Sequence, residues 1–173
     1  MSNELQNEYV IDGLNRIVSV GCQWDRFALE NNGRDSLAAI VVGQSVWNFV
    51  AGVPTREILE FLFRSCRSQG ENISLNYRCD SALMQRHFEM TIIPLSQDRL
   101  RITHDLQFMD VAKGGPRDVQ YVSSGGSERC SICNNVHLSD RWVDLFQQKA
   151  GCTQVSNYIV CPHCQGNALR MLA

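Results

Sequence analysis

The amino-acid sequence predicts an α+β protein: a five-stranded antiparallel sheet with helices on one face, followed by a small module stapled by metal. Three observations carry this prediction. They are a long helical pattern at 54–70, three alternating apolar segments between 71 and 109, and two Cys-x-x-Cys pairs near the end. A chain of 173 residues is long enough for one good core and a small appended module.

The first half of the chain predicts mainly short elements and one long helix. We expect a short helix at 3–13, two short strands within 15–31 that break near Gly21, and short helical turns at 37–52. The clearest helix spans 54–70, with Pro54 at its start and Gly70 at its end. Its apolar residues recur at steps of three and four, as on one helical face: Ile58, Leu59, Leu62, Phe63 and Cys66.

Three segments alternate apolar and polar residues with the period of a strand, at 71–80, 86–93 and 99–109. They are joined by short turns, which favours an antiparallel sheet with one face covered. The preceding helices are the only elements available to cover that face.

Two motifs precede the long helix. One is the Trp24-Asp25-x-Phe27 segment, and the other is a turn with Gly43, Trp47 and Phe49. With the order of elements, these motifs resemble a bacterial PAS subfamily over roughly 9–109. The resemblance implies a sensory and dimerisation domain, assigned here to 1–109, whose five-stranded sheet can enclose a cofactor or metabolite.

The same resemblance directs attention to a ligand pocket in this domain. Trp47, Phe49 and Phe63 are candidates to line it, although aromatic residues at such spacings also serve simply as core. His104 is in phase with the apolar residues of its strand, so it is either a core histidine or an axial ligand for haem.

Composition changes after the last of the three strands. Residues 110–128 hold two Gly-Gly pairs, a proline and a serine pair, which predicts a linker. The remaining module, 129–173, is too short for a robust core and needs a staple. Within it we expect a strand at Trp142 and Val143, a short helix over 144–151, a strand over 156–160 and a terminal helix over 165–173.

A metal site that stabilises this module is predicted from Cys130 and Cys133, which repeat the spacing of Cys161 and Cys164. Zinc prefers four such ligands in a tetrahedron, and each Cys-x-x-Cys turn supplies two thiolates. A closed set of four thiolates favours a structural site.

Other readings of these cysteines fit less well. Covalent haem attachment requires a histidine directly after the second cysteine, but Asn134 and Gln165 stand there. A thioredoxin-type pair needs a βαβ unit, for which this region has no room. His137 and His163 lie close enough in sequence to compete as ligands.

Charge and hydropathy restrict the partners. The net charge is −2, and the chain holds no block of basic residues, so nucleic-acid binding is not expected. No apolar run approaches the ~20 residues of a membrane span, and the polar N-terminus lacks a secretory signal. We therefore expect a cytoplasmic protein whose eight cysteines are thiols or metal ligands.

No catalytic motif stands in the sequence. The sequence favours a non-enzymatic signalling protein, in which a PAS sensor binds a small molecule or forms a homodimer and the zinc module engages a protein partner. One alternative is a redox or gas sensor that uses haem in the PAS cavity or the zinc thiolates themselves. A third reading is a small zinc-dependent transcription regulator.

Overall fold

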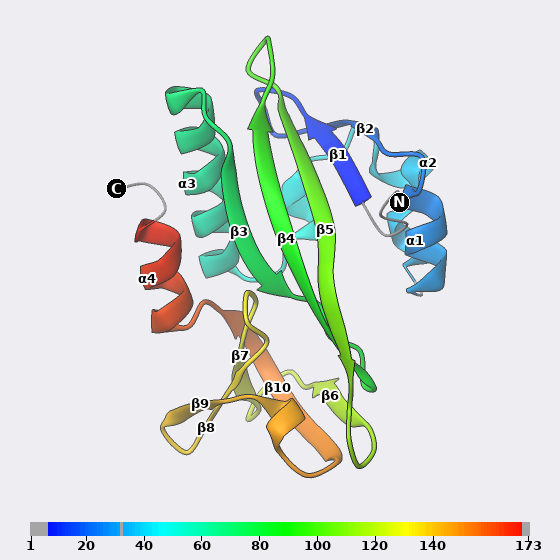
Figure 1. The fold of residues 1–173 in the computed structure, drawn as a ribbon, viewed down its shortest axis with the longest axis vertical. Coiled ribbons are helices and arrows are strands. Elements are labelled where there is room, and N and C mark those ends of the chain that lie inside the picture. Colours follow the sequence, from blue (N-terminus) through cyan, green and yellow to red (C-terminus); the bar gives the residue numbers. More distant parts are fainter. Residues whose placement is uncertain (1–6, 32, 171–173) are drawn as a thin grey trace. The chain divides into compact units, whose positions relative to one another are not determined.

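The computed structural model describes residues 7–31 and 33–170 and has the predicted α+β composition, with two separate sheets (Figure 1). Its helices and strands follow in the order β1 (Asn7–Ile11), β2 (Ile17–Val20), α1 (Trp24–Glu30), α2 (Ala38–Val41), α3 (Val53–Gln69), β3 (Ile73–Arg78), β4 (Met84–Pro94), β5 (Leu100–Val111), β6 (Arg117–Tyr121), β7 (Ser127–Cys130), β8 (Val136–Leu138), β9 (Arg141–Val143), β10 (Gly151–Ile159) and α4 (Pro162–Arg170). Short 3-10 turns lie at Arg34–Ser36, Val46–Phe49 and Leu145–Gln147.

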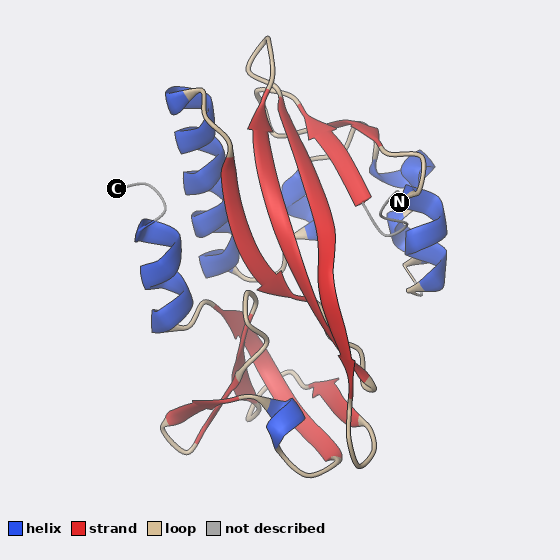
Figure 2. Cartoon of the chain, in the orientation of Figure 1, coloured by secondary structure: helices blue, strands red, loops and turns tan. Residues whose placement is uncertain are grey.

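The first sheet has the strand order β2-β1-β5-β4-β3, as the strands drawn in red in Figure 2 show. Strand β1 pairs antiparallel with both β2 and β5. The three strands predicted between 71 and 109 are present as β3, β4 and β5, and the helix predicted at 54–70 is present as α3. The predicted apolar face of α3 is buried at Leu62, Phe63 and Cys66.

Two expectations for the N-terminal segment are wrong. The helix expected at 3–13 is strand β1 from Asn7 to Ile11, and the part before Asn7 lies outside the described residues. Two neighbouring strands supply β1 with backbone partners, an arrangement that local periodicity does not report. The second strand expected after Gly21 is helix α1, whose Trp24, Phe27 and Ala28 have helical spacing.

The second sheet has the order β6-β10-β7-β8-β9. Strand β10 lies between β6 and β7 and is parallel to both, whereas β7, β8 and β9 pair antiparallel. Its buried apolar cluster is small and consists of Val136, Leu145 and Val155.

The structure also differs from the expected linker and from the expected short helix. Arg117–Tyr121, within the 110–128 segment, is strand β6, because it finds a partner in β10 more than thirty residues later. The helix expected over 144–151 is reduced to the turn Leu145–Gln147, and Gly151 already begins β10. The terminal helix begins earlier than expected, at Pro162, and its predicted end lies beyond the described residues.

The chain divides into two compact units that do not follow one cut in the sequence. The first contains the described residues up to Val50, with Leu59–Leu75 and Glu89–Leu106. The second contains Ala51–Ile58, Asn76–Phe88 and the described residues from Gln107 onwards. None of the helices in the described part of the chain is long and apolar enough to span a membrane.

Candidate metal centre

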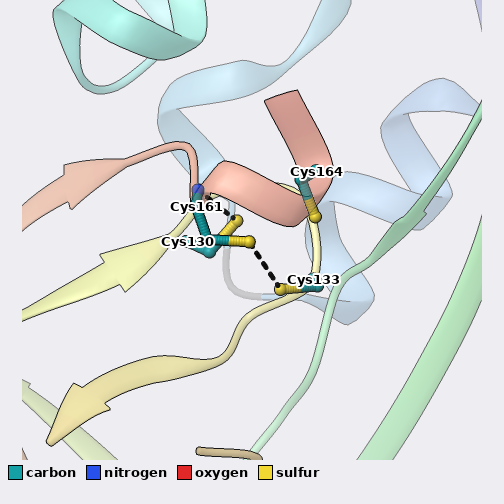
Figure 3. Close-up of side chains that lie close together, drawn as sticks. All are labelled: Cys130, Cys133, Cys161 and Cys164. Carbon is teal, nitrogen blue, oxygen red and sulfur yellow. Dashed lines mark hydrogen bonds between the residues drawn. The ribbon is translucent and has the colours of Figure 1, made fainter. Parts of the chain in front are cut away.

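Parallel pairing of β7 with β10 brings the two Cys-x-x-Cys segments together. Ile159 near the end of β10 is in register with Cys130 at the end of β7. Strands that run in parallel end at the same edge of a sheet, so the turns that follow them are neighbours. One pair follows β7, and the other lies at the start of α4 (Figure 3).

The spacing of the sulfur atoms fits a metal ion. The four Sγ atoms of Cys130, Cys133, Cys161 and Cys164 all lie within 4.8 Å of one another, and those of Cys133 and Cys161 are 3.8 Å apart. Zinc–sulfur bonds of about 2.3 Å in a tetrahedron place neighbouring sulfurs about 3.8 Å apart. The thiols predicted to act together are therefore close enough to hold an ion such as zinc.

Backbone hydrogen bonds shape both turns. The Cys130 amide donates to the Asn135 carbonyl at 2.8 Å, and Asn134 between them adopts a left-handed φ of 60° that asparagine tolerates well. The Cys161 amide donates to Cys130 Sγ at 3.4 Å, which links one pair to the other. Such a donor stabilises negative charge on sulfur and suits a thiolate ligand.

Burial and mutual hydrogen bonding shift the thiol titrations apart. Hydrogen bonds from Cys133 and Cys164 hold the pKa of Cys130 well below its usual range. Hydrogen bonds with Cys130 and Cys133 raise the pKa of Cys164. Crowded thiols of this kind cannot all ionise without a cation, and a divalent metal would supply the positive charge.

A buried ion-pair cluster supports the first cysteine turn from the end of β3. The Arg78 amide donates to the Ile132 carbonyl at 2.7 Å, and Asn134 Nδ2 donates to the Arg78 carbonyl at 3.1 Å. The Arg78 guanidinium binds Asp80 at 2.6 Å and Asp144 at 3.1 Å. Burial alone would lower the pKa of Arg78, but the two carboxylates outweigh burial and raise it.

The two histidines considered as competing ligands lie outside the cysteine cluster. His163 Nε2 is 3.1 Å from Asn167 Nδ2 on the exposed side of α4. His137 stacks on Trp142, with ring centres 5.1 Å apart. Cys152, the remaining cysteine of this region, is exposed in β10.

The first unit contains a cavity of about 270 Å³ with a mainly apolar lining. Its walls come from β1, β2 and the short helical elements that follow, and include Tyr9, Trp24, Phe27, Val41, Val46 and Phe49. Asn7 also lines it, and its Oδ1 atom is buried without a hydrogen-bond partner among the described residues.

Of the four pocket residues expected from the sequence, only Phe49 lines this cavity. Trp47 instead stacks on Phe63 with ring centres 5.6 Å apart, which is a core contact. His104 stacks on Tyr9 at 5.8 Å, and burial lowers its pKa to about 4.

The sequence reading missed Asn7, Tyr9 and Trp24 as lining residues. Asn7 and Tyr9 were placed in the expected helix, so their shared position on β1 was hidden. The helical spacing of Trp24, Phe27 and Ala28 was a signal that could have indicated one cavity wall.

No protein-family model matches this chain, and no curated protein matches it either. Among solved structures it is similar to a domain of an HTR-like protein from Haloarcula marismortui, with 17% sequence identity and a TM-score of 0.40. The likeness covers 60% of this chain and 98% of that domain. A TM-score this low does not assign the chain to a family.

Proposed function

We propose that this chain is a non-enzymatic sensory protein. Its first unit binds a small, largely apolar ligand, and a zinc ion stabilises its second unit. The cavity of about 270 Å³ carries the sensory part of this proposal. Its lining is mainly aromatic and aliphatic, and Asn7 adds one buried polar oxygen that has no hydrogen-bond partner among the described residues. This combination is typical of small-molecule sites, where a few polar groups select the ligand.

The finer fold that we propose for the first sheet is PAS-like. Two strands, short helical elements, one long helix and three further strands follow in the order that the sequence resemblance implies. The five strands form one sheet, and the cavity lies against β1 and β2 of that sheet.

Zinc is the metal that we propose for the cysteine cluster. Four thiolates with no fifth ligand among the described residues favour zinc, and a closed set leaves no position for a substrate, so the proposed role of the metal is structural. A reducing compartment such as the cytoplasm would keep the eight cysteines free of disulfides, four as zinc ligands and the other four as thiols.

Signalling would follow if the ligand changes how the protein associates. A ligand shifts an equilibrium only by its difference in affinity for two states, so we expect the bound and free proteins to differ in self-association or in capture of a protein partner.

Indole is a suitable probe, since it is flat, apolar and has one N–H donor for Asn7 Oδ1. We expect indole to bind saturably and to raise the melting temperature, while benzothiophene, which has the same shape without the donor, binds more weakly. Replacement Asn7→Leu should weaken indole binding by roughly tenfold, as expected for one lost hydrogen bond. Titration calorimetry measures both affinities.

Asn48 provides the matched control, because it is exposed and does not line the cavity. Asn48→Leu should leave indole binding unchanged. If neither indole nor benzothiophene binds saturably, the proposed ligand site is contradicted.

A further inference from the structure

A second cavity, of about 400 Å³, adjoins the cysteine cluster within the second unit. Its walls come from the ends of β3, β4 and β5 in this unit, from the first cysteine turn and from α4. Cys133 and Cys164 line it, whereas Cys130 and Cys161 do not. The cluster therefore has two sulfur-bearing residues on the cavity side and two on the closed side.

Burial sets Cys133 apart from the other three cysteines, and it is the cavity lining that distinguishes Cys164. Cys130 and Cys161 have exposed fractions of 0% and 2%. Cys133 is only partly buried, and Cys164, although 5% exposed, lines the cavity beside it. A small molecule in this space meets one residue from each Cys-x-x-Cys pair.

The residues that line this cavity favour entry of a small uncharged molecule. No carboxylate in the described part of the chain lines the cavity, and the one guanidinium found there, that of Arg78, is already paired with Asp80 and Asp144. His87 stacks on Phe108 with ring centres 3.9 Å apart, and burial, followed by the charge of Arg78, lowers the pKa of His87. An uncharged peroxide therefore meets neither repulsion nor a strong competing ion at the sulfurs.

We propose that Cys133 and Cys164 are a modification site for hydrogen peroxide, which reaches them through this cavity and thereby opens the metal centre. This inference rests on the proposed zinc site. One thiolate attacks a peroxide oxygen, the O–O bond breaks, and the departing hydroxide takes a proton from solvent to form water. The resulting sulfenic acid is attacked by the second thiolate, which forms a disulfide and releases a second water.

The electrons balance in this sequence. Two thiolates lose two electrons to become one disulfide, and one peroxide with two protons becomes two waters. The sulfurs of Cys133 and Cys164 lie within 4.8 Å of each other, which places the second thiolate close to a sulfenic acid formed on the first. A disulfide no longer offers two thiolates to a metal, and zinc leaves.

The test uses the full chain with Cys22 and Cys152 replaced by serine, which removes the two exposed thiols outside the cluster and leaves the buried Cys66 and the partly buried Cys79. Zinc per chain is first measured by elemental analysis, and this step tests the proposed metal site separately: a protein without zinc overturns both proposals. Peroxide is then added, zinc release is followed with a chromogenic chelator, and dimedone adducts and disulfides are mapped by mass spectrometry.

We expect the first adducts and the first disulfide at Cys133 and Cys164, and we expect dithiothreitol with zinc to restore the metal content. Early modification of Cys130 or Cys161 would overturn the inference, and so would metal loss that dithiothreitol does not reverse. The adducts and disulfides are mapped in a chain whose cavity residues are unchanged, so this test does not depend on whether a cavity variant folds.

A cavity-filling variant tests the route itself. Gln107 is exposed on β5 and lines the cavity, so Gln107→Trp should slow zinc release by about threefold or more by narrowing access to the thiolates. Met109, 56% exposed on the same strand and outside the cavity lining, supplies the control Met109→Trp, which should not slow release. Equal rates for the two variants would show that the cavity is not the route.

Discussion

The first unit buries many large apolar side chains, whereas the second buries few and contains instead a buried ion-pair network and a cluster of four cysteines. Among the largest fully buried side chains of the described residues, those of the first unit are Phe63, Ile11, Leu62, Ile92, Leu100, Ile102, Val41 and Cys66. The second unit contributes only Val136, Val155 and Cys130 to that set.

The two units therefore obtain their stability from different interactions. Burial of large apolar side chains supports the first, at about 1.5–3 kcal/mol for each one. The second has a small cluster around Val136, an ion-pair network around Arg78 and four converging cysteines. Small regions of this kind typically need a metal or another staple.

The largest expected effect comes from breaking the proposed metal site. Cys161→Ser removes one of its four proposed ligands, and structural zinc contributes about 10 kcal/mol or more to folding of small zinc modules. We expect zinc to fall from one per chain towards zero, and the amide NMR signals of 129–170 to lose dispersion while those of 59–69 persist. Elemental analysis and a ¹⁵N–¹H spectrum measure both.

Cys152→Ser is the matched control, since Cys152 is an exposed thiol of the same sheet and lies outside the cluster. It should keep full zinc. Full zinc in Cys161→Ser as well would refute the four-cysteine assignment.

A smaller loss is expected from breaking the ion-pair network. The side chains of Arg78 and Asp80 are 9% and 4% exposed, so Arg78→Ala leaves the buried Asp80 and the partly buried Asp144 without their cation. Removing one partner of a buried pair costs about 3–5 kcal/mol. Urea unfolding followed by the amide NMR signals of 129–170 should report this loss in the second unit, since tryptophan fluorescence would also report Trp24 and Trp47 of the first.

The exposed pair Arg26–Glu30 provides the contrast, with both side chains more than half exposed. Arg26→Ala should change stability by less than about 1 kcal/mol. A comparable loss in both variants would mean that burial of the Arg78 network has no special role.

The smallest expected effect is a pH dependence in the first unit. The unfolded chain protonates His104 near pH 6.5, whereas burial lowers the folded-state pKa to about 4. Between these values the unfolded state binds more protons, so stability is full above pH 6.5 and falls as the pH drops towards 4. The loss at pH 5 is about 2 kcal/mol at most.

Replacement His104→Gln should flatten this part of the stability profile, and His163→Gln, at an exposed position, should leave it unchanged. Thermal unfolding between pH 4 and 8 measures the difference between the three proteins. Identical slopes for wild type and His104→Gln would refute the role of burial at His104.

Local pattern was sufficient for the long elements and for the cysteine set. The three- and four-residue steps of α3 and the alternation in β3, β4 and β5 are properties of each segment alone. The repeated Cys-x-x-Cys spacing likewise reflects the geometry of one tight turn, and it selected the four thiols that come together.

Pairing between strands far apart in the sequence determined two strands that local hydrophobic periodicity did not predict. Asn7–Ile11 is a strand because β2 and β5 flank it, and Arg117–Tyr121 is a strand because β10 does, although its surroundings read as a linker. The sequence by itself therefore determined the α+β class, the long helix and the four cysteines that come together. Only the tertiary structure decided that β7 and β10 run parallel and that Cys133 and Cys164 line a cavity, because both depend on contacts between segments far apart in the chain.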